Sequence, residues 1–319
     1  MGVGSELGTK RIIMPTLLAN NIRLHLRELG PRGAPALLLV QGLGMQITDW
    51  PQALLNRLAR RYRVILFDNR DYGRSQLCGP AIDPALSEAD YPFAPVALER
   101  AIYSLRDMAL DTLGVLDALG IAHAHVLGFS MGGMIAQMLA ALHPGRVLSL
   151  VSLMSSGGQA VIPSAVIPAA VIPVDAPAAR ALARMIVHVP DRAGLIAQSL
   201  EAAQIWAGPH HVLDAKRAAR HIELGLRRCY RPAAIHRQAL AYASAGERFA
   251  LLRRIACPTL ILHGGADPLI PPAFARQAHL LIPGSRFLVL PDAAHDLGAL
   301  DAVAIASLIE AATSIDFAL

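Results

Sequence analysis

The spacing of hydrophobic positions changes several times along the chain, and each spacing predicts a different element. Uninterrupted apolar runs predict strands buried on both faces, as in a parallel sheet. The segments 36–40 and 63–67 are of this kind, and strands are also predicted at 124–127, 147–151, 259–262 and 286–290. Amphipathic or small-residue patterns predict helices at 49–61, 98–119, 131–142 and 301–312. Because strands alternate with helices, we expect an α/β fold with a mostly parallel, doubly wound sheet.

Two segments depart from this alternation. Residues 12–29 are typical of a β-hairpin with its turn at Asn20-Asn21. From 158 to 246 only helices are predicted, at 176–187, 191–207, 212–229 and 232–245. An all-helical insertion after the sixth strand is expected to cap the mouth of the sheet.

The predicted division is therefore a sheet domain in two parts, 1–157 and 250–319, with a helical cap at 158–249. Residues 1–10, which are rich in glycine, are expected to be a frayed end.

The entrance to this insertion contains a short repeat. Ala-Val-Ile-Pro occurs at 160–163, 165–168 and 170–173. A period of five matches neither a helix nor a solenoid, and the prolines would break a membrane-spanning helix. We interpret the repeat as a stiff apolar hinge loop. A lid that meets lipid surfaces is the alternative.

Composition narrows the classes of function. Of the 319 residues 54% are apolar, which suffices for a large core, and 17% are charged. The net charge of +5 suggests a nucleic-acid partner, but the arginines are scattered and aromatic residues are only 5%. We therefore expect no nucleic-acid partner. Neither a signal peptide nor a membrane-spanning stretch is evident, so stable membrane insertion is not expected.

The three cysteines are far apart in the chain. Cys78, Cys229 and Cys257 form no CxxC pair and have no spacing typical of a metal site or a disulfide framework. We expect three reduced thiols, no metal and a cytoplasmic protein.

The strongest chemical motif is Gly128-Phe129-Ser130-Met131-Gly132-Gly133, between a predicted strand and a predicted helix. This is G-x-S-x-G in the context of a nucleophile elbow. A serine on such a sharp turn projects its hydroxyl into the cleft, and the close approach of strand and helix requires glycine two residues to either side. Ser130 is therefore the predicted nucleophile, with Gly128 and Gly132 shaping the turn.

A serine nucleophile needs a base and an acid to orient that base. Asp267 and His295 each follow a predicted strand, and the carboxyl ends of parallel strands are where such sheets place their sites. They are the predicted partners of Ser130. Asp292 and Asp296, which flank His295, are alternative orienting acids, and His263 is interpreted as structural.

The oxyanion of a tetrahedral intermediate needs two backbone donors. We expect one from the amide of Met131, at the start of the helix, and the other from the amide of Leu43, within Gln41-Gly42-Leu43-Gly44. Only the backbone of these two residues would act.

Together these motifs resemble the α/β-hydrolase superfamily over nearly the whole chain. Asp68-x-Arg70-Asp71-x-Gly73-x-Ser75 and His295-Asp296-Leu297 are similar to a bacterial esterase subgroup that includes aclacinomycin methylesterase. The resemblance implies an acyl-enzyme mechanism, no cofactor, and substrate choice by the helical cap. Gln41 departs from the histidine common before the oxyanion glycine. For Asp68 and Arg70, a structural role near the oxyanion loop is favoured over a catalytic one.

The predicted function is hydrolysis of a carboxylic ester, a small molecule such as a methyl or short alkyl ester of an apolar acid. The motifs leave open a carbon–carbon bond hydrolase or a cofactor-free perhydrolase with the same three residues, and a non-catalytic ligand receptor of the same fold. Epoxide hydrolases and dehalogenases are excluded because they need an aspartate where Ser130 stands. The sequence does not predict an oligomeric state.

Overall fold

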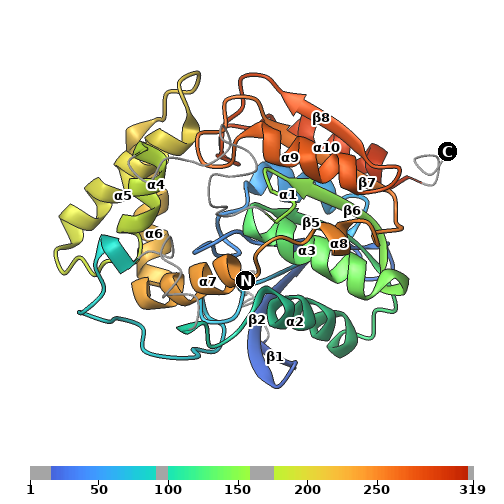
Figure 1. The fold of residues 1–319 in the computed structure, drawn as a ribbon, viewed down its shortest axis with the longest axis horizontal. Helices are drawn as coiled ribbons and strands as arrows, with labels where there is room; N and C mark the ends of the chain where they lie inside the picture. Colours follow the sequence, from blue (N-terminus) through green and yellow to red (C-terminus); the bar gives the residue numbers. More distant parts are fainter. Residues whose placement is uncertain (1–15, 91–99, 159–175, 315–319) are drawn as a thin grey trace, which may run out of the picture.

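A computed structural model describes residues 16–90, 100–158 and 176–314. Within these residues the centre is an eight-stranded sheet in the order β1-β2-β4-β3-β5-β6-β7-β8 (Figure 1). The strands are β1 (Thr16–Ala19), β2 (Ile22–Leu29), β3 (Ala36–Val40), β4 (Arg63–Phe67), β5 (Ala124–Phe129), β6 (Val147–Leu153), β7 (Thr259–Gly264) and β8 (Arg286–Leu290). β2 pairs antiparallel with β1 and β4, and all other pairs are parallel.

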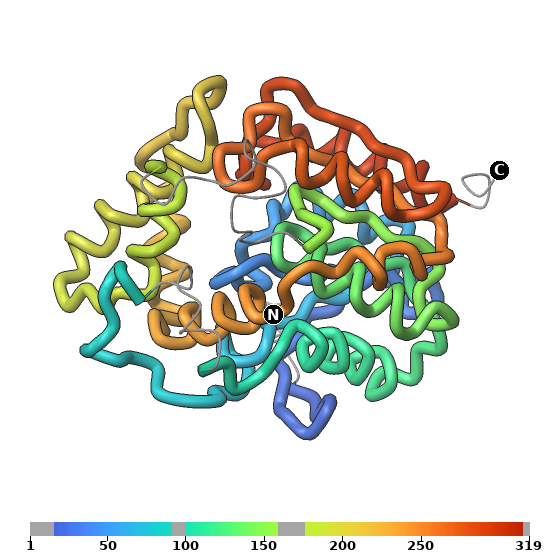
Figure 2. Tube along the Cα trace, viewed as in Figure 1, coloured from blue at the N-terminus to red at the C-terminus, as the bar shows by residue number. Residues whose placement is uncertain are grey.

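Helices cover both faces of this sheet, which confirms the doubly wound α/β-hydrolase architecture. One face carries α1 (Gln52–Leu58) and α10 (Ala302–Ala312), and the other carries α2 (Leu105–Ala118), α3 (Met131–Leu142), α8 (Phe249–Leu252) and α9 (Pro272–Leu281). Figure 2 shows the same path as a tube.

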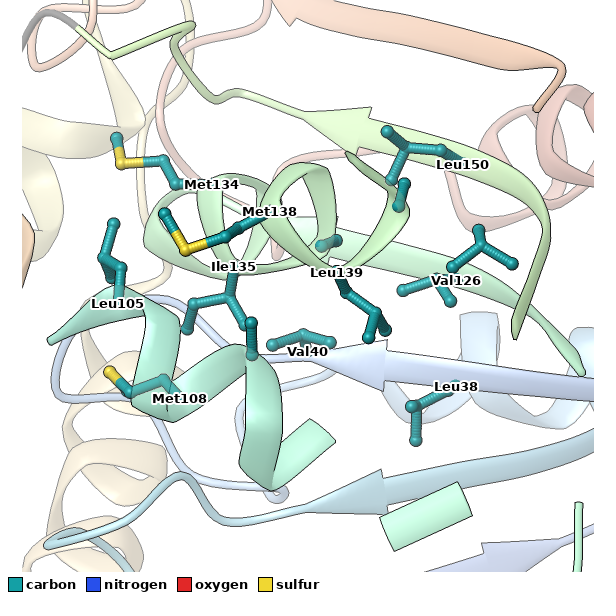
Figure 3. Close-up of a cluster of buried hydrophobic side chains, with 14 of the residues drawn as sticks. Leu38, Val40, Leu105, Met108, Val126, Met134, Ile135, Met138, Leu139 and Leu150 are labelled. Carbon is teal, nitrogen blue, oxygen red and sulfur yellow. The ribbon is translucent and has the colours of Figure 1, made fainter. Parts of the chain in front are cut away.

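The continuous apolar sequence of β3 is explained by its central place in the sheet. Leu38 and Val40 belong to the core beneath α2 and α3 (Figure 3), whereas Leu37 and Leu39 belong to the core beneath α1 and α10. All four are completely buried. Successive strand side chains point to opposite faces, so a strand with a core on each side has no place for a polar residue.

Four helices follow β6 before the chain returns to the sheet at β7. They are α4 (Pro177–Arg184), α5 (Arg192–Ala207), α6 (Ala215–Arg228) and α7 (Pro232–Ser244). Proline stands at the start of α4 and α7, and Asp191 and Asp214 accept amide hydrogen bonds at the starts of α5 and α6. Figure 1 shows α4, α5 and α6 gathered away from the sheet. The prediction of a helical insertion after the sixth strand is confirmed.

Two predicted boundaries were wrong. Helix α2 begins at Leu105, because Ser104 and Asp107 form a capping box there, and Ile102 lies before it with 59% of its surface exposed. Helix α1 begins at Gln52, directly after Pro51, rather than at Asp49.

Helices α8 and α9 were not predicted. α9 begins at Pro272, directly after Pro271, and proline is well tolerated in the first turn of a helix.

Some predicted features lie outside the described residues. These are the start of the hairpin at 12–14, the frayed end at 1–10 and the Ala-Val-Ile-Pro repeat. The hairpin turn itself is confirmed, since β1 and β2 are joined by Asn20 and Asn21, both with positive φ.

Asp68 and Arg70 are engaged in structural contacts, as the sequence favoured. Asp68 is fully buried and accepts the amide of Ile47 at 2.9 Å, in the loop after β3. Its carboxylate also pairs with Arg228 of α6, at 2.5 Å and 3.2 Å. Arg70 makes a bidentate pair with Asp111 of α2, at 2.6 Å and 2.7 Å. Asp68 thus ties the loop after β3 to an inserted helix.

A second buried ion pair joins α7 to the same region. Arg237 donates to both oxygens of Asp71, at 2.7 Å and 2.8 Å, and the Asp71 carboxylate is completely buried. Tyr103 donates a further hydrogen bond to Asp71, at 2.9 Å. The carboxylate therefore has charged and neutral partners in a place that water does not reach.

Replacing Arg237 with methionine is expected to lower the free energy of unfolding by about 3–5 kcal/mol, because Asp71 is left as an uncompensated buried charge. Urea denaturation measures this difference. The matched control is Arg227→Met, which removes an exposed pair with Glu223 and should cost less than about 1 kcal/mol. Equal losses in the two variants would show that the buried pair has no special role.

Candidate active site

Ser130 lies on the turn between β5 and α3 in a conformation that few residues adopt. Its φ is 55° and its ψ is −123°, and its amide donates to the carbonyl of Leu153 at 2.9 Å. A Cβ on Gly128 would overlap the carbonyl oxygen of Gly132, and a Cβ on Gly132 would overlap that of Val40. Only glycine fits at these two positions, so the backbone forms the sharp elbow that the sequence predicts.

The structure brings Ser130, His295 and Asp267 together. Nε2 of His295 lies 3.0 Å from Oγ of Ser130, and Nδ1 of His295 lies 2.7 Å from Oδ2 of Asp267. The three residues come from the carboxyl ends of β5, β8 and β7, and all are buried. A carboxylate accepts only, so Nδ1 carries the ring proton and Nε2 is left to accept from the serine hydroxyl.

The surroundings of Asp267 favour its ionised form. Burial alone would raise the pKa of this carboxyl, but the charge and hydrogen bond of His295 outweigh burial, and the pKa is lowered. The other oxygen accepts the amides of Leu269 and Ile270 at 2.9 Å and 2.8 Å. Asp267 is therefore held in one orientation as an acceptor for His295.

The alternative acids lie elsewhere. Asp292 is exposed, and Asp296 accepts the amide of Gly298 at 2.7 Å. His263 donates from Nε2 to the carbonyl of Ile270 at 2.8 Å, so it supports the same turn that holds Asp267. Burial lowers the pKa of His263 below 6.5, which keeps its ring neutral.

The lowered pKa of His263 makes stability depend on pH. The unfolded chain takes up a proton as the pH falls below 6.5, before the folded protein does, so stability is fully present above this value and is lost as the pH falls toward the folded pKa. Three other histidines have pKa values lowered by burial in the same way: His25, His125 and His236. Between about pH 8 and about pH 5, urea midpoints should decrease.

The variant His263→Asn should show a smaller decrease with pH than the parent protein, whereas the exposed His210→Asn should keep the full decrease. If His263→Asn has the parent's pH dependence, His263 is not one of the groups responsible.

The loop after β3 runs beside the elbow. Among the described residues, no acceptor takes a hydrogen bond from the amide of Leu43 or Met131. Met131 is the first residue of α3, where a helix presents free amides and positive dipole. Two predicted donors for an oxyanion thus have no competing acceptor within that part of the chain.

Side chains from the inserted helices hold this loop. Gln238 of α7 accepts the amide of Gly44 at 3.1 Å and donates to the carbonyl of Arg70 at 2.8 Å. The side chain of Asn69 donates to the carbonyl of Gln41 at 3.0 Å. The amide group of Gln41 itself is fully buried and has no hydrogen-bond partner among the described residues.

Sequence reasoning missed Gln238 and Trp206. The carbonyl of Trp206, near the end of α5, accepts the amide of His295 at 2.9 Å. The ring of His295 also lies 5.1 Å from the ring of Phe129. A backbone contact of this kind leaves no trace in a residue pattern. From the sequence, Gln238 is only one polar residue in the predicted helix 232–245, and its burial is seen only in the structure.

Within the part of the chain that the structure describes, no cluster of three or more His, Cys, Asp or Glu side chains is arranged as metal ligands. None of the helices in that same part is both long and apolar enough to cross a bilayer.

The fold and this arrangement of residues define a class of protein. The model of the α/β hydrolase fold family matches residues 35–301, and the chain belongs to this family.

Relatives with known names refine this assignment. The chain is 30% identical to rhodomycin D methylesterase DnrP of Streptomyces peucetius, over 89% of this chain and 93% of the relative. It is 34% identical to a pimeloyl-[acyl-carrier protein] methyl ester esterase of Neisseria meningitidis serogroup B, over 54% of this chain and 62% of the relative. The resemblance to bacterial esterases is thereby confirmed.

A solved structure agrees in fold. The esterase RhEst1 from Rhodococcus sp. ECU1013 superposes with a TM-score of 0.69 at 23% identity, and the match covers 94% of this chain and 98% of that one.

Proposed function

We propose that this protein is a serine hydrolase that cleaves a carboxylic ester through an acyl-enzyme intermediate, with Ser130, His295 and Asp267 as its catalytic triad. The observation that carries the proposal is the continuous hydrogen-bonded line from Oγ of Ser130 through the imidazole to the carboxylate, at 3.0 Å and 2.7 Å. Membership of the α/β hydrolase fold family and the named methylesterase relatives support it.

In the first half of the reaction, Nε2 of His295 takes the proton of Ser130 as Oγ attacks the ester carbonyl. The ionised Asp267 fixes the ring tautomer and stabilises the imidazolium that forms. When the tetrahedral intermediate collapses, the bond to the alkoxy group breaks, and His295 returns the proton to the departing alcohol. The acyl group remains on Ser130.

In the second half, a water molecule replaces the alcohol. His295 removes a proton from the water, its oxygen attacks the acyl carbon, and the ester bond to Ser130 breaks. The serine oxygen regains a proton from His295, and the carboxylic acid leaves.

The amides of Leu43 and Met131 are the proposed oxyanion hole. They act on negative charge that develops only in the tetrahedral intermediates, so they favour the transition state over the bound ester. The N-terminus of α3 adds positive potential at the same point.

The proposed cap, residues 158–249, supplies an apolar surface near this loop. Met185 and Ile235 pack against Gly44, and Ile235 belongs to a small apolar cluster with Tyr72. Such a surface suits an ester with an apolar acid part. The named substrates of the relatives are methyl esters, so we propose a methyl or short alkyl ester of an apolar acid.

We further propose a cytoplasmic location. The three thiols, Cys78, Cys229 and Cys257, are all unpaired, as expected in a reducing compartment.

The test is hydrolysis of p-nitrophenyl esters from acetate to long acyl chains, together with methyl esters of apolar acids. Turnover of short or medium chains supports the proposal, and the chain-length profile reports what the cap admits. Failure on all esters, with turnover of a ring-cleavage diketone or formation of a peracid, would replace ester hydrolysis with one of those reactions. Tight binding of an ester without turnover would indicate a receptor.

A further inference from the structure

A buried arginine outside the proposed active site has no counter-charge among the described residues. Arg248 directly precedes α8 and is 3% exposed. Its Nη2 donates to the carbonyl of Ser156 at 3.0 Å, whereas Nε and Nη1 have no hydrogen-bond partner in the described part of the chain. Of the five N–H donors of a guanidinium, at least the three on Nε and Nη1 are therefore unused.

This arrangement is energetically unfavourable as it stands. Burial lowers the pKa of Arg248 to about 10, so the group is still charged at neutral pH. A buried charge is tolerated when it is paired or fully hydrogen-bonded, and Arg248 is neither. The ionisable hydroxyl of Tyr242 favours the charged form of Arg248, but it offsets only part of the effect of burial.

Arg248 lines a cavity of about 200 Å³ between α2, α3 and α8. The start of α2 contributes Ser104, Leu105 and Arg106 to the wall; Arg106 is exposed, and Ser104 and Asp107 cap the helix there. Glu247 also lines the wall but is exposed. Arg248 is thus the buried charged residue among those that line the cavity.

The segment that Arg248 contacts contains two buried hydroxyls. Those of Ser155 and Ser156 have no hydrogen-bond partner among the described residues. Ser156 is the residue whose carbonyl Arg248 binds.

We propose that Arg248 is the centre of a binding site for a small oxyanion, a carboxylate or a phosphate, reached through this cavity. The fork of the guanidinium matches the paired oxygens of such groups. The site lies where both connections of the inserted helices meet the sheet. Ser156 follows β6, where the chain leaves the sheet, and Arg248 lies between α7 and β7, where the chain returns to it. The backbone at Gly158 also touches the backbone of Arg248. A bound anion therefore holds the two connections together.

The experiment compares thermal unfolding of the full-length parent protein and Arg248→Met in chloride, acetate and phosphate at equal ionic strength. A ligand that binds only the folded state raises the midpoint in proportion to the logarithm of its concentration. We expect acetate, phosphate or both to raise the parent's midpoint by about 2–5 °C at saturation, with the variant shifting by less than about 1 °C. If acetate raises the midpoint at the lower concentration, the ligand is a carboxylate; if phosphate does so, the ligand is a phosphate.

Two further variants separate binding from folding. Arg254→Met removes an exposed arginine nearby and should keep the parent's response. Arg248→Lys keeps the charge but not the fork, so it should fold. It should need at least tenfold more anion than the parent protein for the same rise in the unfolding midpoint. Equal responses of parent and Arg248→Met, or no response of the parent to either oxyanion by unfolding or by titration calorimetry, would overturn the proposal. The readout is independent of ester hydrolysis.

Discussion

Replacing Ser130 with alanine is expected to reduce kcat for ester hydrolysis by about 10⁶-fold, the scale seen when a triad nucleophile is removed. The reason is that Oγ of Ser130 forms the covalent bond to the acyl group, and no other hydroxyl among the described side chains is hydrogen-bonded to His295. Steady-state kinetics with a p-nitrophenyl ester, supported by a single-turnover burst in the parent protein, measure the loss.

The control for this variant is Ser149→Ala. Ser149 is also buried, lies near the start of β6 and hydrogen-bonds to His125 at 2.8 Å, at the other end of the strands from the elbow. It should keep kcat within about threefold of the parent value, because it lies outside the site. If Ser130→Ala retained activity comparable to that of Ser149→Ala, a covalent serine mechanism would be wrong.

The parts that the sequence predicted well are those with local causes. The elbow needs glycine at 128 and 132, because neighbouring backbone leaves no room for a Cβ. The six consecutive residues 128–133 are therefore enough to predict it. The buried strands and the inserted helices follow from apolar spacing, which depends on each segment's own environment. The placement of Asp267 and His295 followed from the rule that sites form at the carboxyl ends of parallel strands.

The missed parts depend on contacts between distant residues. Arg237 and Asp71 are 166 positions apart, and nothing in the pattern of either segment indicates that they pair. Gln238 reads as one polar residue in a helix until the fold places it against Gly44. α9 was not predicted either, although it begins at Pro272 and proline is favoured in the first turn of a helix. Long-range pairing therefore limited the prediction more than local propensity did.

These distant contacts also bear on the site itself. Asp68 binds the amide of Ile47 in the loop after β3 and pairs with Arg228 of α6, and Gln238 of α7 binds Gly44 in the same loop. The proposed oxyanion donor Leu43 therefore lies in a loop fixed from both sides. An oxyanion hole must be rigid before charge develops, and these contacts supply the rigidity.

Replacing Asp267 with asparagine is expected to reduce kcat by about 10⁴-fold, the scale observed when a triad aspartate becomes an amide. The amide side chain can still accept the amides of Leu269 and Ile270, so the turn and the fold should persist. If its amide nitrogen faces His295, however, it donates to Nδ1. The proton then moves to Nε2, which can no longer accept the proton of Ser130.

The matched variants are Asp292→Asn and Asp296→Asn, which flank His295 in the chain but are not hydrogen-bonded to its ring. They should keep kcat within about threefold of the parent value. Circular dichroism and the urea midpoint of Asp267→Asn show whether the fold is intact, so a loss of rate can be assigned to the tautomer. A loss confined to Asp296→Asn, with Asp267→Asn near the parent rate, would transfer the orienting role to Asp296 and contradict the triad proposed from the 2.7 Å contact.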